Sequence, residues 1–506
     1  MEASRFLSQA AFGGTANDIA RVQALGFDGW LNEEFGKPTS ARYFDLVSPG
    51  GPDAVDADTA DGKRVIPRAL WRKFIASPDV LRQRITLALT EIFVLSVQPV
   101  LVPNRGSAVA YFMDILEGNA FGNYRDLLMK VSKSPAMAAY LTFLKSRKAA
   151  NGSQPDENYA RELMQLFSIG ISRLNPDGTP VLVGGALVDT YSEQDVQGLA
   201  RVFTGWVLVE TGDAPGGVPS AVPLINRARD HELGTKSFLG TTVPANTDAQ
   251  TSLQIVIDTL MAHPNMAPFV SRQLIQRLVT SNPSPAYVAR VAKAFEGNGS
   301  ASSKGDMKAT LRAIFLDPDA RAVSTLTDPS FGKLREPMVR FIQWARTFKL
   351  PPGSSGYYAM HELSDPATAL AQSPLTSPSV FNFFRPGYVP PNSTLGDRQI
   401  TAPEFQITTE SSVAGYMNFM QLAVSGRVSS VGAANYDALR PLVPDSAALL
   451  AQLNLLLAAG QISQATLAPL QAALDTISVN TSAGANNRLY AAVLFVLCAP
   501  EYIVQK

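Results

Sequence analysis

Apolar and polar positions in the middle of the chain follow a helical period. Between Asn158 and Ser168 the apolar residues form one broad stripe at helical spacing. The opposite face carries five polar side chains, which are Asn158, Arg161, Glu162, Gln165 and Ser168. Gly170 follows, and a glycine here is typical of a left-handed helix stop. The pattern therefore predicts a short amphipathic helix with one strongly polar face.

A second amphipathic helix is predicted shortly downstream. Ser192 and Asp195 have the spacing of a capping box, which favours a helix start at Ser192. Apolar residues then recur at i, i+3, i+4 and i+7. Gly205 ends this pattern, and Trp206 follows it.

Helical periods dominate the remaining chain, so we expect a mainly α protein, a multi-helix assembly with small inserted β-hairpins. Alternating apolar residues around Gly/Pro turns indicate the hairpins. The expected organisation is an N-terminal helical pair at 1–36, a central helical core at 67–348 with β-hairpin insertions near 171–190 and 206–243, an irregular aromatic and Pro-rich segment at 350–412, and C-terminal helices at 413–506.

Composition narrows the functional classes. Lys and Arg together number 43, as do Asp and Glu, so the formal net charge is zero and there is no electrostatic footprint for nucleic acid. We expect no membrane span, because the sequence has no run of about 18 apolar residues. Cys498, the single cysteine, lies in an apolar run and is expected to be a small buried hydrophobe.

A series of motifs along the chain resembles a known bacterial family, the domain-of-unknown-function 1800 family. The motifs come in the order ASRFLSQAAFGGT, LRQRITLALTEIFVLS, AFGNYRDLL, PDENYARELMQLFSIG, YSEQDVQGLARVFTGW, HELGTKSFLG, HPNMAPFVSRQLIQRLV and SPSVFNFFRPGY. They span nearly the whole chain, from about residue 3 to 505. This chain departs from the family pattern at His231-Glu232, where members often have His-Asp.

The resemblance implies a location and a kind of partner, but no reaction. Family members are mostly exported and are often encoded beside a sulfatase-like family. We therefore expect a periplasmic or secreted protein whose leader is absent from this chain, with a cytoplasmic location as the alternative. A sulfatase-like secreted protein is the expected protein partner.

Two carboxylates on the adjacent helices are the first catalytic candidates. Glu162 and Asp195 are expected to act as general acid and base, as glycoside hydrolysis requires, at roughly 5–10 Å from each other in one cleft. Arg161, Arg201 and Asn158 are expected to bind the substrate. The competing structural interpretation places Glu162 with Arg161, Arg201 and Arg84 in a charge network between packed helices, and makes Asp195 a helix cap.

Histidines provide a third catalytic candidate. His231 lies in a loop of ionisable residues and is expected to act as a general base. With His263 and a carboxylate it offers a set of ligands for a divalent metal. No HExxH spacing supports a metal, and His263-Pro264 also suits a helix start. We therefore expect no cofactor, with a divalent metal at His231 and His263 as the alternative.

Aromatic residues complete the expected substrate surface. Trp206 and the loop residues Phe381, Asn382 and Arg385 are expected to contact sugar rings or an extended polymer. The alternative is a loop that inserts its aromatic side chains into the helical core.

The leading functional hypothesis is a secreted protein that acts on an extracellular polymer, a polysaccharide in particular, as a carboxylate-dependent hydrolase or lyase. A non-catalytic scaffold or assembly partner is the alternative, and it predicts an exposed apolar patch. A metal-dependent oxidoreductase built on His231 and His263 is a further alternative. Nucleotide enzymes and ordinary serine hydrolases are disfavoured, because the sequence lacks Walker A, GxGxxG and GxSxG motifs.

Overall fold

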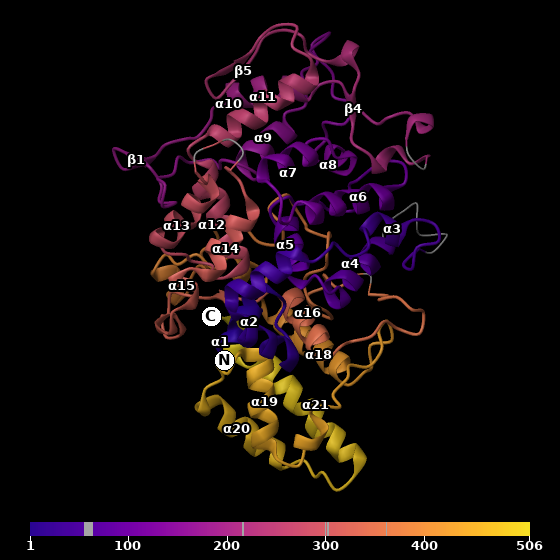
Figure 1. Cartoon of the computed structure of the whole chain (residues 1–506), viewed down its shortest axis with the longest axis vertical. Helices are drawn as coiled ribbons and strands as arrows, with labels where there is room; N and C mark the ends of the chain where they lie inside the picture. The colour runs from indigo at the N-terminus through magenta and orange to yellow at the C-terminus, as the bar shows by residue number, and fades with distance from the viewer. Residues whose placement is uncertain (55–63, 215–216, 299, 301–302, 361) are drawn as a thin grey trace.

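The computed structural model describes residues 1–54, 64–214, 217–298, 300, 303–360 and 362–506. Helices dominate this part of the chain, and its strands pair only as four two-stranded antiparallel sheets (Figure 1). The prediction of a mainly α fold with small hairpins is therefore confirmed. No helix among these residues is both long and apolar enough to cross a membrane.

The first part of the chain is helical, and its second helix, α2 (Ala16–Gly36), is kinked where Gly26 has a φ of 70°. Thr15 and Asp18 make a reciprocal capping box that starts α2. The helices are α1 (Glu2–Ala10), α2 (Ala16–Gly36), α3 (Tyr43–Val47), α4 (Val65–Ala76), α5 (Val80–Thr90), α6 (Arg105–Gly118), α7 (Tyr124–Val131) and α8 (Pro135–Tyr140).

The next part carries the two motif helices and the hairpins. Its helices are α9 (Asn158–Gln165) and α10 (Glu193–Ala200), and a 3-10 turn, η1 (Arg201–Phe203), continues α10. The paired strands are β1 (Leu182–Val183) with β2 (Ala186–Leu187), β3 (Trp206–Val207) with β4 (Ile225–Asn226), and β5 (Lys236–Phe238) with β6 (Thr241–Val243).

Helices return after the hairpins, and the last strand brings the end of the chain back to the middle. β7 (Lys333–Leu334) pairs with β8 (Val504–Gln505) in antiparallel register. The other elements are α11 (Ala249–Ala262), α12 (Met266–Leu278), α13 (Pro285–Glu296), α14 (Met307–Leu316), α15 (Pro318–Arg321), η6 (Val323–Leu326), α16 (Pro337–Thr347), α17 (Thr394–Asp397), η7 (Pro403–Ile407), α18 (Glu410–Val424), α19 (Ser446–Ala458), α20 (Gln464–Asp475), α21 (Ser482–Cys498) and α22 (Pro500–Ile503).

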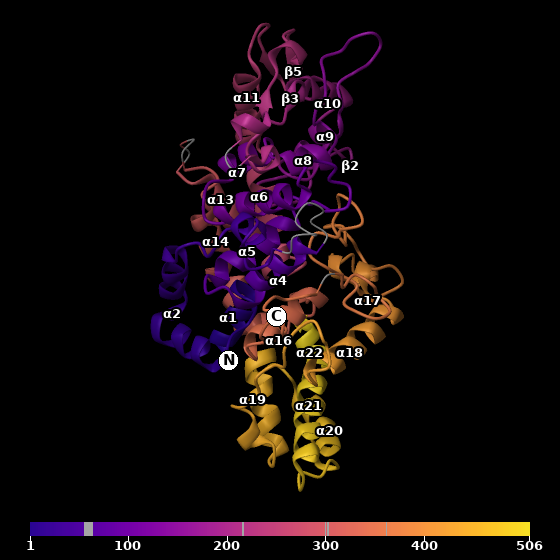
Figure 2. The same cartoon turned by 90° about the vertical axis from the view of Figure 1, so that its right-hand side faces the viewer.

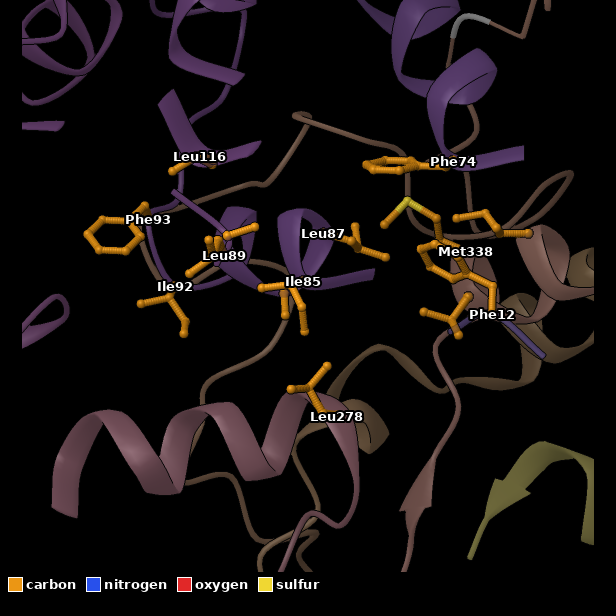
Figure 3. Packing of buried hydrophobic residues seen from close by; sticks show 14 of the residues in the cluster. Phe12, Phe74, Ile85, Leu87, Leu89, Ile92, Phe93, Leu116, Leu278 and Met338 are labelled. Carbon is orange, nitrogen blue, oxygen red and sulfur yellow. The ribbon is translucent and has the colours of Figure 1, made fainter. Parts of the chain in front are cut away.

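One helix, α5, lies at the centre of the hydrophobic core. Ile85, Leu87 and Leu89 on α5 are each at most 1% exposed. They pack with apolar side chains from α4, α6, α12 and α16, so segments far apart in sequence meet here (Figure 3). The C-terminal helices α19, α20 and α21 extend away from this centre (Figure 2).

The polar face of the first motif helix is shorter than the sequence predicts. α9 ends at Gln165, and Gly170 has a φ of 70° where the left-handed stop was expected. Ser168 lies beyond the helix and is fully buried, with its hydroxyl donating to the Leu163 carbonyl at 2.5 Å. The prediction that Ser168 belongs to the polar face is therefore wrong.

Candidate functional site

Three side chains of α9 form a partly accessible polar stripe, which we call the α9 stripe: Asn158, Glu162 and Gln165. They are spaced i, i+4 and i+7, so they lie one above another on the helix. Two neighbouring segments border them. The Asn158 amide donates to the Thr142 hydroxyl at 3.5 Å, and the Tyr191 hydroxyl donates to Gln165 Oε1 at 3.4 Å.

Glu162 is the chemically unusual member of the α9 stripe. Its side chain is 7% exposed, and its Oε2 atom has no hydrogen-bond partner among the residues that the structure describes. Burial raises the pKa of Glu162 to about 6, since the opposing effect of the Arg161 charge is smaller. A carboxyl group with this pKa exchanges its proton close to neutral pH.

Two half-buried tyrosines lie within the electrostatic field of Glu162. Burial, with the Glu162 charge, raises the pKa of Tyr140 to about 12. Burial raises the pKa of Tyr191 to about 12 as well, against the effect of Arg161 and with that of Glu162. Both rings stay partly accessible, so they can border a molecule that reaches the α9 stripe.

Arg161 is directed to other carboxylates. Its guanidinium pairs with Glu157 at 3.3 Å and with Glu193 of α10 at 2.9 Å, and the three side chains are between 33% and 52% exposed. Arg84 is not part of this set, because it is buried and donates to the Arg277 carbonyl. The predicted charge network of Glu162, Arg161, Arg201 and Arg84 is therefore wrong.

A hollow does lie between the two motif helices. Its volume is about 230 Å³, and it is lined by Gln154, Pro155, Glu157, Gln197, Ala200 and Arg201. The carboxylate facing this hollow is Glu157. Arg201 is exposed at its edge, and its role in substrate binding stays a prediction.

Asp195 has a structural role. Its Oδ2 accepts hydrogen bonds from the Ser192 amide and hydroxyl, both at 2.7 Å, and its Oδ1 accepts from the Leu239 amide at 2.6 Å. Burial raises the pKa of Asp195, but the bonds from Ser192 and Leu239 outweigh it and hold the pKa below its usual value. Asp195 thus starts α10 and fixes the β5–β6 turn, as the capping alternative predicts, and both of its oxygens are occupied.

His231 and Trp206 lie inside the fold, 1% and 2% exposed. His231 Nδ1 lies 3.0 Å from the Thr204 carbonyl oxygen, and Nε2 has no hydrogen-bond partner within the described part of the chain. Burial lowers the pKa of His231, so it is neutral near pH 7. The Trp206 indole donates to the Val202 carbonyl at 3.3 Å. The predicted catalytic role of His231 and the predicted substrate contact of Trp206 are therefore wrong, because a polymer cannot reach either side chain.

His263 lies in the turn between α11 and α12. Its Nδ1 accepts the Asn265 amide at 3.1 Å, just before α12. Across the described residues no group of three His, Cys, Asp or Glu side chains is arranged to hold a metal ion, so the set of His231, His263 and a carboxylate does not assemble there.

The aromatic loop packs on α12 and η7, away from α9. Phe384 lies under the Arg277 guanidinium at 5.4 Å, and the Arg385 amide donates to Gln406. Asn382 is 4% exposed, so its predicted contact with a polymer is wrong. Phe381 and Arg385 remain at the surface as a stacked pair, with the guanidinium 5.1 Å from the ring centre.

A second concentration of ionisable groups, missed in the sequence, is buried where α5, α12, β7, α16 and η7 meet. We call it the buried charge cluster. Arg277 Nε lies 3.1 Å from Glu91 Oε2, and Lys333 Nζ lies 3.1 Å from Glu404 Oε1 and 3.5 Å from Glu336 Oε1. Its members are Arg84, Glu91, Arg277, Lys333, Glu336 and Glu404, each at most 5% exposed.

The cluster holds three basic and three acidic side chains, but several of their polar atoms have no hydrogen-bond partner among the described residues. Burial and the nearby Glu336 charge raise the pKa of Glu91 well above its usual value. A small cavity beside Glu91 leaves about 10 Å³ for the centre of a water molecule, enough for one water. Glu91, Ser373 and Asn382 all line it, and among the described residues Ser373 Oγ, Asn382 Nδ2 and the Glu91 carboxylate oxygens have no hydrogen-bond partner, although Glu91 Oε2 is ion-paired with Arg277.

A family model described as a protein of unknown function, DUF1800, matches residues 5–504. The chain belongs to the DUF1800 family. No curated protein and no solved structure matches it.

The DUF1800 assignment confirms the resemblance seen in the motifs, but it carries no reaction. The two candidate sites in this DUF1800 chain are the α9 stripe, with Glu162, and the buried charge cluster, with Glu91. The α9 stripe is partly accessible, and the buried charge cluster is sealed apart from a cavity for one water. Of these two sites, the α9 stripe is the one whose carboxyl group is flanked by partly accessible side chains, Asn158 and Gln165.

Proposed function

We propose that the protein acts on an extracellular polymer, a polysaccharide in particular, by proton transfer at Glu162. The supporting observation is its unpaired, mostly buried carboxyl group with a pKa of about 6. Cleavage of a glycosidic bond by hydrolysis or elimination needs a side chain that gives or takes a proton close to neutral pH. A carboxyl group raised by an apolar setting is suited to this step.

The surroundings of Glu162 suit a carbohydrate chain. Tyr140 and Tyr191 are partly accessible, and tyrosine rings pack on the apolar faces of sugars while their hydroxyls bond. Asn158 and Gln165 offer amide donors and acceptors along the same line. Arg161, with Glu157 and Glu193, supplies the charged border and a second carboxylate outside the interior.

A polymer screen tests the proposal. Wild-type protein and Glu162→Gln are incubated with a panel of bacterial and plant polysaccharides, and new reducing ends or unsaturated products are measured. We expect turnover to fall by about 10²–10⁴-fold in Glu162→Gln while the melting temperature stays within a few degrees. Glu296→Gln, the same change at an exposed position on α13, is the control. Equal turnover in wild type and Glu162→Gln would reject Glu162 as the proton-transfer group.

One observation favours the second candidate, an assembly partner of another exported protein. A largely apolar cavity of about 640 Å³ lies where the first residues meet η6, α22 and β8. Val323 at its wall is 66% exposed. If a sulfatase-like partner encoded beside this protein binds there, Val323→Arg will abolish co-purification and Leu101→Arg, at another exposed position, will not.

A further inference from the structure

The β1–β2 hairpin is apolar on both of its faces. Residues 179–188 contain no ionisable side chain, and they turn at Gly184-Gly185, both with positive φ. Leu182, Val183 and Leu187 are 55%, 69% and 59% exposed. Successive residues of a strand point to opposite faces, so Leu182 and Val183 expose different sides of the hairpin.

The base of this hairpin is firmly attached to the body. The Asn265 side chain donates to the carbonyls of Ile169 and Ser172, at 2.8 Å each, and accepts the Leu174 amide at 2.9 Å. The backbone ladder continues upward, with the Arg173 amide donating to the Val188 carbonyl. The apolar tip is therefore held out from the edge of the molecule, as Figure 1 shows at β1.

We propose that this hairpin tip inserts into the surface of a lipid bilayer. A protein partner covers one face of a two-stranded hairpin, whereas lipid chains surround it on all sides. Apolar side chains on both faces therefore fit lipid better than protein. The nearest ionisable residues in sequence, Asp177 and Asp189, lie at the base, where they would stay in the headgroup region. The tip has no basic residues, so insertion does not depend on anionic lipid.

Insertion would place the α9 stripe next to the membrane surface. The hairpin leads directly into Tyr191, whose hydroxyl contacts Gln165 of the stripe. This inference is independent of the reaction at Glu162, because it rests on exposed apolar side chains alone.

Tryptophan quenching tests the insertion. The native tryptophans, Trp30, Trp71, Trp206 and Trp344, are at most 3% exposed, so their emission is a constant background. Leu182→Trp and Leu101→Trp are mixed with phosphatidylcholine vesicles that carry bromine on the acyl chains. We expect the added emission to be quenched and shifted to the blue in Leu182→Trp, and to be unchanged in Leu101→Trp, whose site between α5 and α6 is 77% exposed.

Vesicle co-sedimentation gives the second measurement. The triple variant L182S/V183S/L187S is expected to lower the partition onto phosphatidylcholine vesicles at least tenfold, and L101S to leave it unchanged. The three side chains are exposed, so the triple variant should melt at the wild-type temperature. Absence of quenching in Leu182→Trp, or unchanged partition of the triple variant, would overturn the proposal. Hairpin-dependent dimers in wild type without vesicle binding would also overturn it, and would assign the hairpin to a second copy of the chain.

Discussion

Glu162 on the α9 stripe and Glu91 in the buried charge cluster both have a raised pKa, with burial as the first cause. They differ in what surrounds them. Glu91 has the Arg277 guanidinium at 3.1 Å and a second carboxyl group, Glu336, within electrostatic reach. Glu162 has only the more distant charge of Arg161, which pairs with other carboxylates. Glu91 is therefore part of a network of buried charges, whereas Glu162 Oε2 has no hydrogen-bond partner among the described residues.

Removal of one member of the buried charge cluster should have the largest effect on stability. Arg277→Met leaves Glu91 without its closest cation, and breaking a buried ion pair from one side costs about 3–5 kcal/mol. We expect a large drop in the melting temperature or loss of soluble protein. Arg440→Met, in an exposed pair with Asp437, should cost less than about 1 kcal/mol. Comparable losses in the two variants would show that the cluster is not a special source of stability.

The pH dependence of the free energy of unfolding should reveal the titration of Glu162. The folded pKa of Glu162 is about 6, against an ordinary value of 4.5, so the folded state holds its proton more tightly than the unfolded state. The stability from this group is complete below pH 4.5 and is lost as the pH rises to about 6. Denaturant titrations between pH 4 and 7 measure this, and Glu162→Gln should flatten the slope. An unchanged slope in Glu162→Gln would place the titration elsewhere.

Activity should follow the same proton. If Glu162 acts as a general acid, turnover is highest below pH 6 and declines above it, as the carboxyl group ionises. A rate that instead rises through pH 6 would assign Glu162 the role of base, and a rate independent of pH between 5 and 7 would remove it from the reaction.

Asp195 tests whether a carboxylate beside the α9 stripe is only structural. Asp195→Ala removes the capping box of α10 and should cost about 1 kcal/mol. Asp248→Ala removes a comparable cap from α11, away from the stripe, and is the matched control. We expect near-normal turnover in both variants, and a larger drop in melting temperature in Asp195→Ala, which also loses the bond from the Leu239 amide. A selective loss of turnover in Asp195→Ala would restore the catalytic role first predicted for it.

Local features of the two regions could be predicted from sequence, but the contacts between distant segments could not. The capping box of Ser192 and Asp195 depends on residues three apart, and the α9 stripe depends on a helical period, so both are visible in the chain itself. Arg84 and Glu91 are also visible as charges in an apolar helical block. Their partners come from α12 and β7, and no local pattern indicates that these segments meet.

Burial was the other property that the sequence could not supply. His231 lies in a polar, loop-rich sequence that suggests exposure, yet hydrogen bonding to Thr204 holds it inside the fold. Asn382 lies in an irregular segment of the sequence, yet it lines the cavity beside Glu91. Its position is set by packing on distant helices. Side chains in loops were therefore predicted less well than those on regular helix faces.

Arg161 should give the smallest change in stability and so sharpens the contrast with Arg277. Its two ion pairs are exposed, and exposed pairs contribute about 0–1 kcal/mol. Arg161→Ala should therefore melt within about two degrees of wild type. Because the variant binds an acidic or hydroxyl-rich polymer more weakly, its KM should rise while its kcat stays unchanged. The measurement is a saturation curve on the polymer found in the screen, beside Arg312→Ala, another arginine in an exposed pair. A fall in kcat with constant KM would mean that Arg161 stabilises the transition state, and that the reacting bond lies over Glu157 and Glu193 and not over Glu162.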